Sequence, residues 1–137
     1  MRLYVVVDTN VLVSALLSKY EDAATVQVLN RVFSDDVGFL YSNDILNEYA
    51  NVLNRPKFIF PKEKIDFLLG SIRKFGIFIS PKSSEVILPD MKDLPFYELV
   101  LEKRCNNSYL VTGNIKHFPR EPFIVTPREL LKILDNN

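Results

Sequence analysis

The stretch Val5-Val6-Val7-Asp8-Thr9-Asn10 carries the strongest structural signal in this chain. Three consecutive β-branched residues are typical of a strand that is buried on both faces, as in the centre of a parallel sheet. The mostly apolar residues that follow, Val11 to Leu17, have the length of a packed helix. Open α/β sheets form their sites at the carboxyl ends of such strands. The stretch therefore predicts an α/β fold with a site around Asp8.

The same stretch has a simpler interpretation. Asp8 or Thr9 can cap the helix, because short polar side chains accept hydrogen bonds from the first backbone N–H groups of a helix. From the sequence alone, Asp8 is either a cap or a carboxylate that takes part in chemistry.

The rest of the chain repeats this alternation of short apolar runs and helical patterns. Further strands are expected at 39–41, 77–79, 109–112 and 123–125. Helices are expected to begin near 21–22, 42–44, 61, 93 and 126. Strands separated by helices imply crossover connections, and these place helices on both faces of a parallel sheet. We therefore expect a three-layer α/β/α fold with a central five-stranded parallel sheet, in a single domain over residues 1–137.

The composition is that of an ordinary globular protein, with 47% hydrophobic and 25% charged residues. No apolar run approaches the roughly 20 residues needed to cross a bilayer. The amino terminus has one basic residue, Arg2, before the first strand and does not resemble a secretory signal. A single cysteine excludes an internal disulfide framework and suits a reducing cytosol. We expect a cytoplasmic protein without a membrane partner.

The charges are unevenly distributed although the net charge is zero. Residues 1–54 contain three basic and seven acidic side chains, whereas residues 55–82 contain seven basic and two acidic ones. An acidic part beside a basic part is compatible with a metal site next to a phosphate-binding surface. The alternative is a solvated helix face, which is the more common origin of such asymmetry.

Three acids occupy comparable places in the predicted elements. Asp8 follows a strand, Glu48 lies one turn into the helix after the second strand, and Asp93 begins a later helix. These positions can converge at the carboxyl edge of the sheet. Three carboxylates in one cleft repel unless a cation joins them, and oxygen ligands favour Mg²⁺ or Mn²⁺. Since such ions activate water for attack on phosphorus, the pattern predicts metal-dependent phosphodiester cleavage.

Other polar residues could support this site. Thr112 and Asn114 end the fourth strand and can bond to a carboxylate or to bound water, although Thr112-Gly113-Asn114 also matches a plain turn. Asn10 lies two residues after Asp8, in the same polar segment Asp8-Thr9-Asn10. Asp90 is either an acid that lies beyond the direct metal ligands or, more simply, a turn residue. His117 can meet a phosphate, but a lone histidine in a loop is more often a surface residue.

The stretch from Val5 to Leu16 closely resembles the opening of PIN-domain proteins, and the resemblance extends over nearly the whole chain. Glu48 and Asp93 match the acidic residues of the second and third blocks of that family, with Asp90 beside the latter. The blocks after the first correspond to residues 42–53, 90–96 and 110–114. The four blocks in order are fairly specific for the fold.

The resemblance implies a five-stranded parallel sheet, bound Mg²⁺ or Mn²⁺, a homodimer and cleavage of RNA, single-stranded or structured. The pattern looks most like the branch of toxin components of toxin–antitoxin systems, which implies an antitoxin protein as partner. Asp8, Glu48 and Asp93 would be the catalytic and metal-binding residues, with Asn114 as a further ligand. Many family members have aspartate at the position of Asn114, so a second metal ion is expected to bind less tightly here.

Two other functions share this architecture. A non-catalytic PIN scaffold that binds RNA or protein is favoured by Asn114 and by the neutral net charge. A phosphoacceptor receiver domain also has an acidic pocket, but receivers usually have adjacent acids after the first strand, where this chain has Asp8-Thr9-Asn10. The four glycines form neither a P-loop nor a dinucleotide-binding motif.

Overall fold

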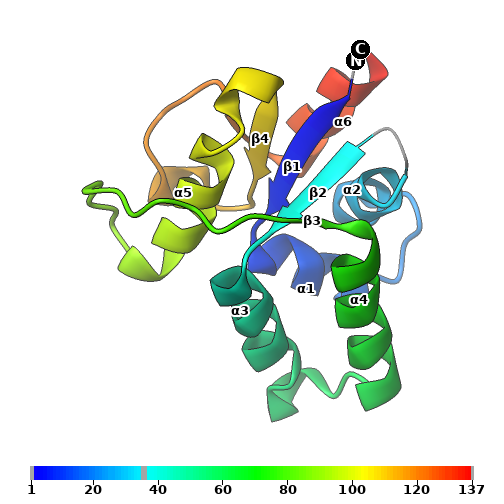
Figure 1. Cartoon of the computed structure of the whole chain (residues 1–137). Helices are drawn as coiled ribbons and strands as arrows, with labels where there is room; N and C mark the ends of the chain where they lie inside the picture. The colour runs from blue at the N-terminus through cyan, green and yellow to red at the C-terminus, as the bar shows by residue number, and fades with distance from the viewer. Residues whose placement is uncertain (1, 35–36, 137) are drawn as a thin grey trace.

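Five strands form one parallel sheet in the computed structural model, which describes residues 2–34 and 37–136. The strand order is β3-β2-β1-β4-β5, and all four pairings are parallel. The strands are β1 (Leu3–Val7), β2 (Val37–Tyr41), β3 (Ile77–Phe78), β4 (Ser108–Val111) and β5 (Ile124–Val125). Their carboxyl ends lie at one edge of the sheet, at the lower end in Figure 1. The predicted five-stranded parallel sheet is confirmed.

The central position of β1 explains its sequence. Val5, Val6 and Val7 are fully buried, since β1 pairs with β2 on one side and with β4 on the other. The backbone N–H of Asp8 donates to the carbonyl of Val111 over 3.0 Å, which continues the pairing with β4 past the end of β1. The backbone of Asp8 is therefore held by the sheet.

Six α-helices in the described residues cover both faces of the sheet, which gives the predicted three layers. In Figure 1, α5 lies on one side of the sheet and α2 and α6 on the other. The helix α2 contacts α1 and α6, whereas α3 contacts α4 and α5. The bounds are α1 (Thr9–Leu17), α2 (Ala24–Val32), α3 (Asn43–Leu53), α4 (Lys62–Phe75), α5 (Leu94–Leu101) and α6 (Pro127–Asp135).

The ends of several helices follow the capping residues in the sequence. The Ser42 hydroxyl accepts a hydrogen bond from the N–H of Ile45 and begins α3. Thr126 and Glu129 form a capping box at the start of α6. Helix α2, by contrast, begins at Ala24 and not at residues 21–22 as expected.

The second strand begins at Val37, before the expected range of 39–41, so that Gly38 lies inside β2. A Cβ added to Gly38 would lie 2.6 Å from Cδ1 of Tyr4, on the neighbouring strand β1. The missing side chain therefore makes room for the Tyr4 ring, which explains a glycine within a strand.

The part of the chain that the structure describes contains no helix with both the length and the apolar character needed to cross a membrane.

Gly70, within α4, and Gly76, at its end, are expected to differ in how substitution by alanine changes the stability of the protein. Gly70 lies within α4, and a Cβ added there meets none of the described atoms within 4 Å. A Cβ added to Gly76 would lie 2.5 Å from the carbonyl oxygen of Ile72. We expect Gly70→Ala to raise the free energy of unfolding by about 0.5–1 kcal/mol, since alanine favours helix. Gly76→Ala is expected to lower it by about 1–3 kcal/mol, because the backbone must shift.

Unfolding in urea, followed by circular dichroism, measures both changes against the unsubstituted protein. Destabilisation by Gly70→Ala, or an unchanged midpoint with Gly76→Ala, would contradict the packing described for this helix.

Candidate active site

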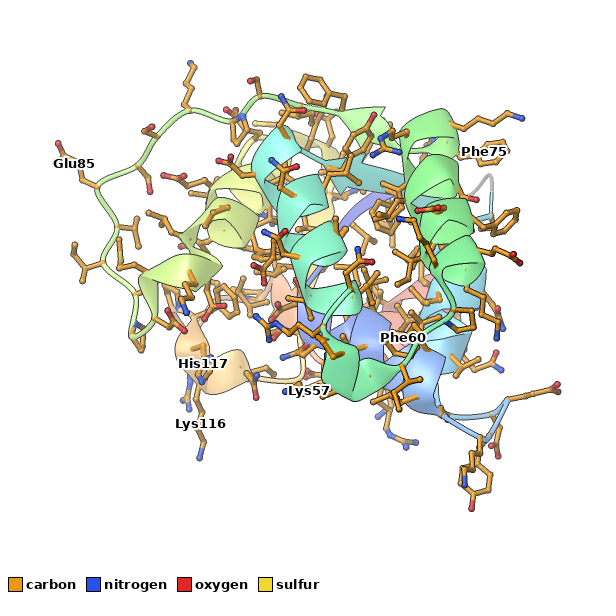
Figure 2. All side chains as sticks on the ribbon, turned by 90° about the horizontal axis from the view of Figure 1, so that it is seen from below. Lys57, Phe60, Phe75, Glu85, Lys116 and His117 are labelled. Atoms are coloured by element: carbon orange, nitrogen blue, oxygen red, sulfur yellow. The ribbon has the colours of Figure 1, made fainter. Side chains whose placement is uncertain are left out.

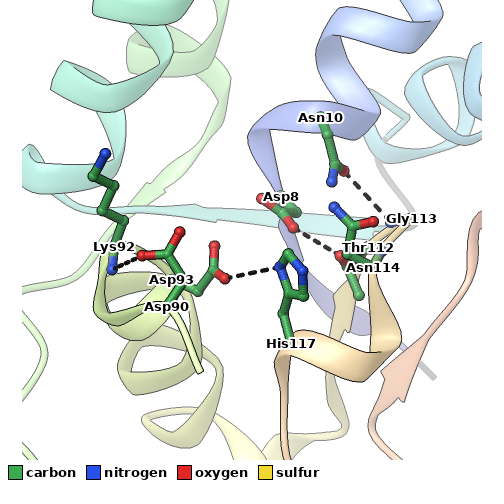
Figure 3. A network of polar contacts seen from close by, with 9 residues as sticks. All are labelled: Asp8, Asn10, Asp90, Lys92, Asp93, Thr112, Gly113, Asn114 and His117. Atoms are coloured by element: carbon green, nitrogen blue, oxygen red, sulfur yellow. Dashed lines mark hydrogen bonds and ion pairs between the residues drawn. The ribbon is translucent and has the colours of Figure 1, made fainter. Parts of the chain in front are cut away.

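The Asp8 carboxylate is buried where β1 ends, next to the end of β4. The hydroxyl of Thr112 donates a hydrogen bond of 2.7 Å to Asp8 Oδ2, and both side chains are buried (Figure 3). The Asp8 backbone occupies the N-cap position of α1, but its side chain makes none of the capping hydrogen bonds that the described part of the chain could offer. The capping interpretation of the Asp8 carboxylate therefore has no support in the structure.

Burial perturbs the acidity of Asp8. The pKa of Asp8 is raised from the ordinary value of 3.8 to about 6, mainly because removal from water disfavours the charged form. The charges of Asp93 and Glu48 contribute to this rise, whereas the hydrogen bond from Thr112 opposes it. The site thus has excess negative potential that a proton or a cation would relieve.

Glu48 reaches this edge from α3. Its carboxylate accepts a hydrogen bond from the Thr9 hydroxyl over 3.5 Å, which connects α3 to the first residue of α1. The next residue, Tyr49, is fully buried and donates its hydroxyl hydrogen bond to the carbonyl of Val7. Tyr49 therefore fixes α3 against the end of β1 and leaves Glu48 partly exposed beside Asp8.

Asp93 approaches from the start of α5. Its Oδ2 atom is buried and has no aligned hydrogen-bond partner among the described residues, although Nδ1 of His117 lies 3.3 Å away at ion-pair distance. Burial raises the pKa of Asp93, the charge of Asp90 raises it further, and His117 opposes the rise. A buried carboxylate oxygen whose contact with His117 lacks hydrogen-bond alignment is a suitable ligand for a cation.

His117 is exposed, as is common for a lone histidine in a loop, but the sequence does not predict its contact with Asp93. It ends a short 3₁₀ turn, Ile115–His117, in the loop after β4 (Figure 3). The sequence feature that could have indicated this contact is the position of His117 three residues after Asn114, in the loop that follows the carboxyl end of β4.

The supporting residues have different roles. The side chain of Asp90 is exposed and accepts a hydrogen bond from the backbone N–H of Lys92, which is the turn role that the sequence favoured.

Oδ1 of Asn10 accepts a hydrogen bond from the N–H of Gly113 over 3.4 Å and links α1 to the loop after β4. Asn114 is exposed, and its N–H donates to the Thr112 hydroxyl. The segment from 112 to 114 is thus both a turn and part of the polar network.

A cleft of about 330 Å³ opens from Asp8 between α1 and α3. Asp8 and Glu48 lie at its wall, whereas Asp93 is not part of the lining. The lining comprises Asp8, Thr9, Asn10, Val13, Ser14, Glu48, Val52, Arg55 and Phe58.

The three acids surround one edge of the sheet without forming a ready-made ligand set. Each interacts electrostatically with the others, since Asp93 and Glu48 both raise the pKa of Asp8 and Glu48 raises that of Asp93. Over residues 2–34 and 37–136, no three His, Cys, Asp or Glu side chains are grouped closely enough to hold a metal ion. Their role as ligands therefore stays a prediction.

The donors present nevertheless fit a hard divalent cation. All are oxygen atoms, the Asp93 Oδ2 atom lacks an aligned partner, and burial raises the pKa of both Asp8 and Asp93. Mg²⁺ and Mn²⁺ prefer such oxygen ligands and retain water in their remaining positions. The binding of one such ion would compensate the excess negative charge.

A family model described as the PIN domain matches residues 4–116. The chain belongs to the PIN-domain family. PIN domains are generally nucleases and generally use divalent metal ions, and the match includes Asp8, Glu48 and Asp93. It ends before β5 and α6, and a single domain over residues 1–137 stays a prediction. Searches of curated proteins and of solved structures gave no match to this PIN domain.

Asp8→Asn is expected to stabilise the metal-free PIN domain at neutral pH. The Asp8 pKa of about 6 in the folded state exceeds the ordinary 3.8, so the folded state binds the proton more tightly than the unfolded chain. The stability of the unsubstituted protein therefore falls as the pH rises from about 4 to 6, by up to about 3 kcal/mol, and remains lower above pH 6. Asparagine buries no charge and removes this contribution.

Urea unfolding at pH 4, 6 and 8 in the presence of chelator measures the effect. If both proteins lose stability equally between pH 4 and 8, the assignment of this loss to Asp8 is wrong.

Proposed function

We propose that this PIN domain is a cytoplasmic Mg²⁺- or Mn²⁺-dependent endoribonuclease. The main support is the buried carboxylate of Asp8 at the end of the central strand, with Glu48 and Asp93 close enough to raise its pKa. Membership of a nuclease family supports phosphodiester hydrolysis as the reaction.

In this proposal Asp8, Glu48 and Asp93 hold the ion, and Asn114 contributes a neutral oxygen. The ion, when bound, supplies positive charge to the phosphate and lowers the pKa of the water that attacks phosphorus. Thr112 keeps the Asp8 carboxylate in place through its hydrogen bond. His117 orients Asp93 from the opposite side of the site.

The protein surroundings favour a polyanion as substrate. Arg55 belongs to the basic segment 55–82 and lines the cleft that begins at Asp8. A guanidinium group there can pair with a phosphate next to the one that is cleaved. The basic helix α4 extends this positive charge beyond the cleft.

We also propose that the protein is the toxin of a toxin–antitoxin pair and forms a homodimer. The support from the structure is an apolar groove between α2 and α4 with two strongly exposed rings, Phe67 at 79% and Phe75 at 65%. Exposed apolar grooves of this kind mark interaction sites for protein partners. An antitoxin would cover the acidic cleft and block access of RNA.

The second candidate function is a PIN scaffold that binds RNA or protein without cleaving RNA. The observation in its favour is that the described acids are not gathered into a metal-ligand group. Cleavage assays distinguish the two functions directly.

Cleavage of a fluorescently labelled single-stranded RNA is expected in Mn²⁺ and not in chelator. Loss of a residue that only supports a metal ligand commonly costs about 10- to 100-fold. We therefore expect Asp8→Asn, Glu48→Gln and Asp93→Asn each to lower the cleavage rate by at least about 100-fold. Asp44→Asn is the control, because Asp44 is an exposed acid in the first turn of α3.

RNA binding without metal-dependent cleavage in the unsubstituted protein would establish the scaffold function instead. Equal loss of cleavage in Asp44→Asn would show that the effect of the other variants is not specific to the site.

Asn114→Asp is expected to raise the affinity for Mn²⁺, because it adds a negative charge next to the residues proposed as ligands. Isothermal titration calorimetry measures this affinity. Asn136→Asp serves as the control, since Asn136 is exposed near the carboxyl terminus, at the opposite end of the molecule (Figure 1). Weaker or unchanged Mn²⁺ binding by Asn114→Asp would refute the proposed role of this residue.

A further inference from the structure

The link between α3 and α4 presents aromatic rings and cations at the outer end of the acidic cleft. We call residues 55–60 the aromatic turn. The rings of Phe58 and Phe60 are stacked, with centroids 5.5 Å apart and planes inclined by 15°. Nζ of Lys57 lies 5.0 Å from the centroid of the Phe58 ring. Both rings are partly exposed and Lys57 is exposed, so these side chains are accessible to a ligand (Figure 2).

The backbone of the aromatic turn is unusual at Ile59. Its φ of 52° and ψ of 34° place it in the left-handed region, which β-branched residues rarely adopt. Its side chain is 85% exposed and therefore adds little to the core. The turn directs Phe58 and Phe60 to the same side, although it leaves an apolar side chain in water. Phe60 also packs against the edge of the core, so the turn presents to solvent the Phe58 ring and the exposed part of the Phe60 ring.

Two residues of the aromatic turn, Arg55 and Phe58, line the same cleft as Asp8 and Glu48. Glu48 and Val52 lie one turn apart on α3, Arg55 follows two residues after the helix ends at Leu53, and all three line the cleft together with Phe58. The rise from Glu48 to the end of α3 is about 8 Å. A chain whose phosphate lies at Asp8 and Glu48 would therefore bring a neighbouring nucleotide to the aromatic turn.

We propose that Phe58 and Phe60 form a stacking platform for an unpaired base of the RNA, with Arg55 and Lys57 contacting the phosphates beside it. Aromatic rings flanked by cations are the combination that binds single-stranded nucleic acids, since every base has a π face and every nucleotide a phosphate. A paired base cannot use the platform, because its faces are covered by its neighbours in the helix. Lys57, which lies over the Phe58 ring, is flexible enough to leave the ring for a phosphate.

The aromatic turn would thus select unpaired RNA and position the strand for cleavage. Phe58 and Phe60 are positioning residues in this proposal, because they act on a base away from the scissile phosphate. The inference rests on the proposed nuclease function, since it places the polymer in the same cleft.

The test measures binding separately from cleavage. Fluorescence anisotropy of a labelled octauridylate is recorded in chelator with the full-length chain carrying Asp8→Asn, so that the RNA stays intact. Base–aromatic stacking supports a loss of roughly 5- to 100-fold in affinity for Phe58→Leu, with affinity restored by Phe58→Tyr. The readout is the dissociation constant, which requires no metal ion and no turnover.

Phe78 offers a control. It is an exposed phenylalanine in β3, and the 14 residues of α4 separate it from Phe60. Phe78→Leu is expected to change the dissociation constant by less than about twofold. Equal effects of Phe58→Leu and Phe78→Leu would overturn the proposal.

An oligomer with abasic sites separates stacking from a merely structural effect. The protein with Phe58 intact is expected to bind the abasic oligomer as weakly as Phe58→Leu binds the octauridylate, and Phe58→Leu should show no further loss. The platform is refuted if the losses in affinity from the abasic oligomer and from Phe58→Leu multiply. It is also refuted if a duplex RNA competes for the protein as well as unlabelled octauridylate does. Thermal unfolding of each variant verifies that it is folded.

The same proteins, tested for cleavage without the Asp8 substitution, distinguish this inference from the proposed function. Base-dependent binding at Phe58 without metal-dependent cleavage would leave the platform valid and refute the nuclease. If Phe58→Leu cleaves RNA with an unchanged KM and an unchanged preference for unpaired RNA, the platform is refuted and the nuclease function is not.

Discussion

The constraint on which the rest of the structure depends is the burial of a carboxylate at the end of the central strand. Asp8 is buried at the end of β1, and its carboxylate accepts a hydrogen bond from Thr112 at the end of the adjacent strand. Burying a charge without a counter-ion is unfavourable, and the raised pKa of Asp8 expresses that cost. A position optimised only for stability would hold a neutral side chain here. The arrangement is understandable if it exists for a cation.

Each element around Asp8 contributes one contact that fixes a polar group at the same edge. Tyr49 binds the last carbonyl of β1 and sets the position of α3, Thr9 connects to Glu48, and His117 faces Asp93. These contacts come from α1, from α3 and from the loop after β4, that is, from elements outside the strands. The sheet fixes the positions of these elements, and the side chains that follow or connect its strands form the candidate site.

The uneven charge distribution of the sequence corresponds to two ends of one cleft. The acidic amino-terminal part contributes Asp8 and Glu48, and the basic segment 55–82 begins with Arg55 at the other end. Phe58 adds an aromatic surface to the basic end. The cationic and aromatic side chains at the basic end are complementary to a polymer of phosphates and bases, and in the proposed function the carboxylates at the other end hold a cation.

The sequence by itself determined the alternation of strands and helices, the central place of β1 and the position of Asp8 at its end. These features depend on local patterns, namely runs of β-branched residues, helical periodicity and capping residues such as Ser42 and Thr126. Tertiary structure alone decided which acids share the cleft, that His117 meets Asp93 and that Phe58 belongs to the site. It also decided that Gly38 lies within β2, because the Tyr4 ring of the neighbouring strand occupies the space of a side chain. Such contacts join residues far apart along the chain, as Thr112 and Asp8 do, and no local pattern encodes them.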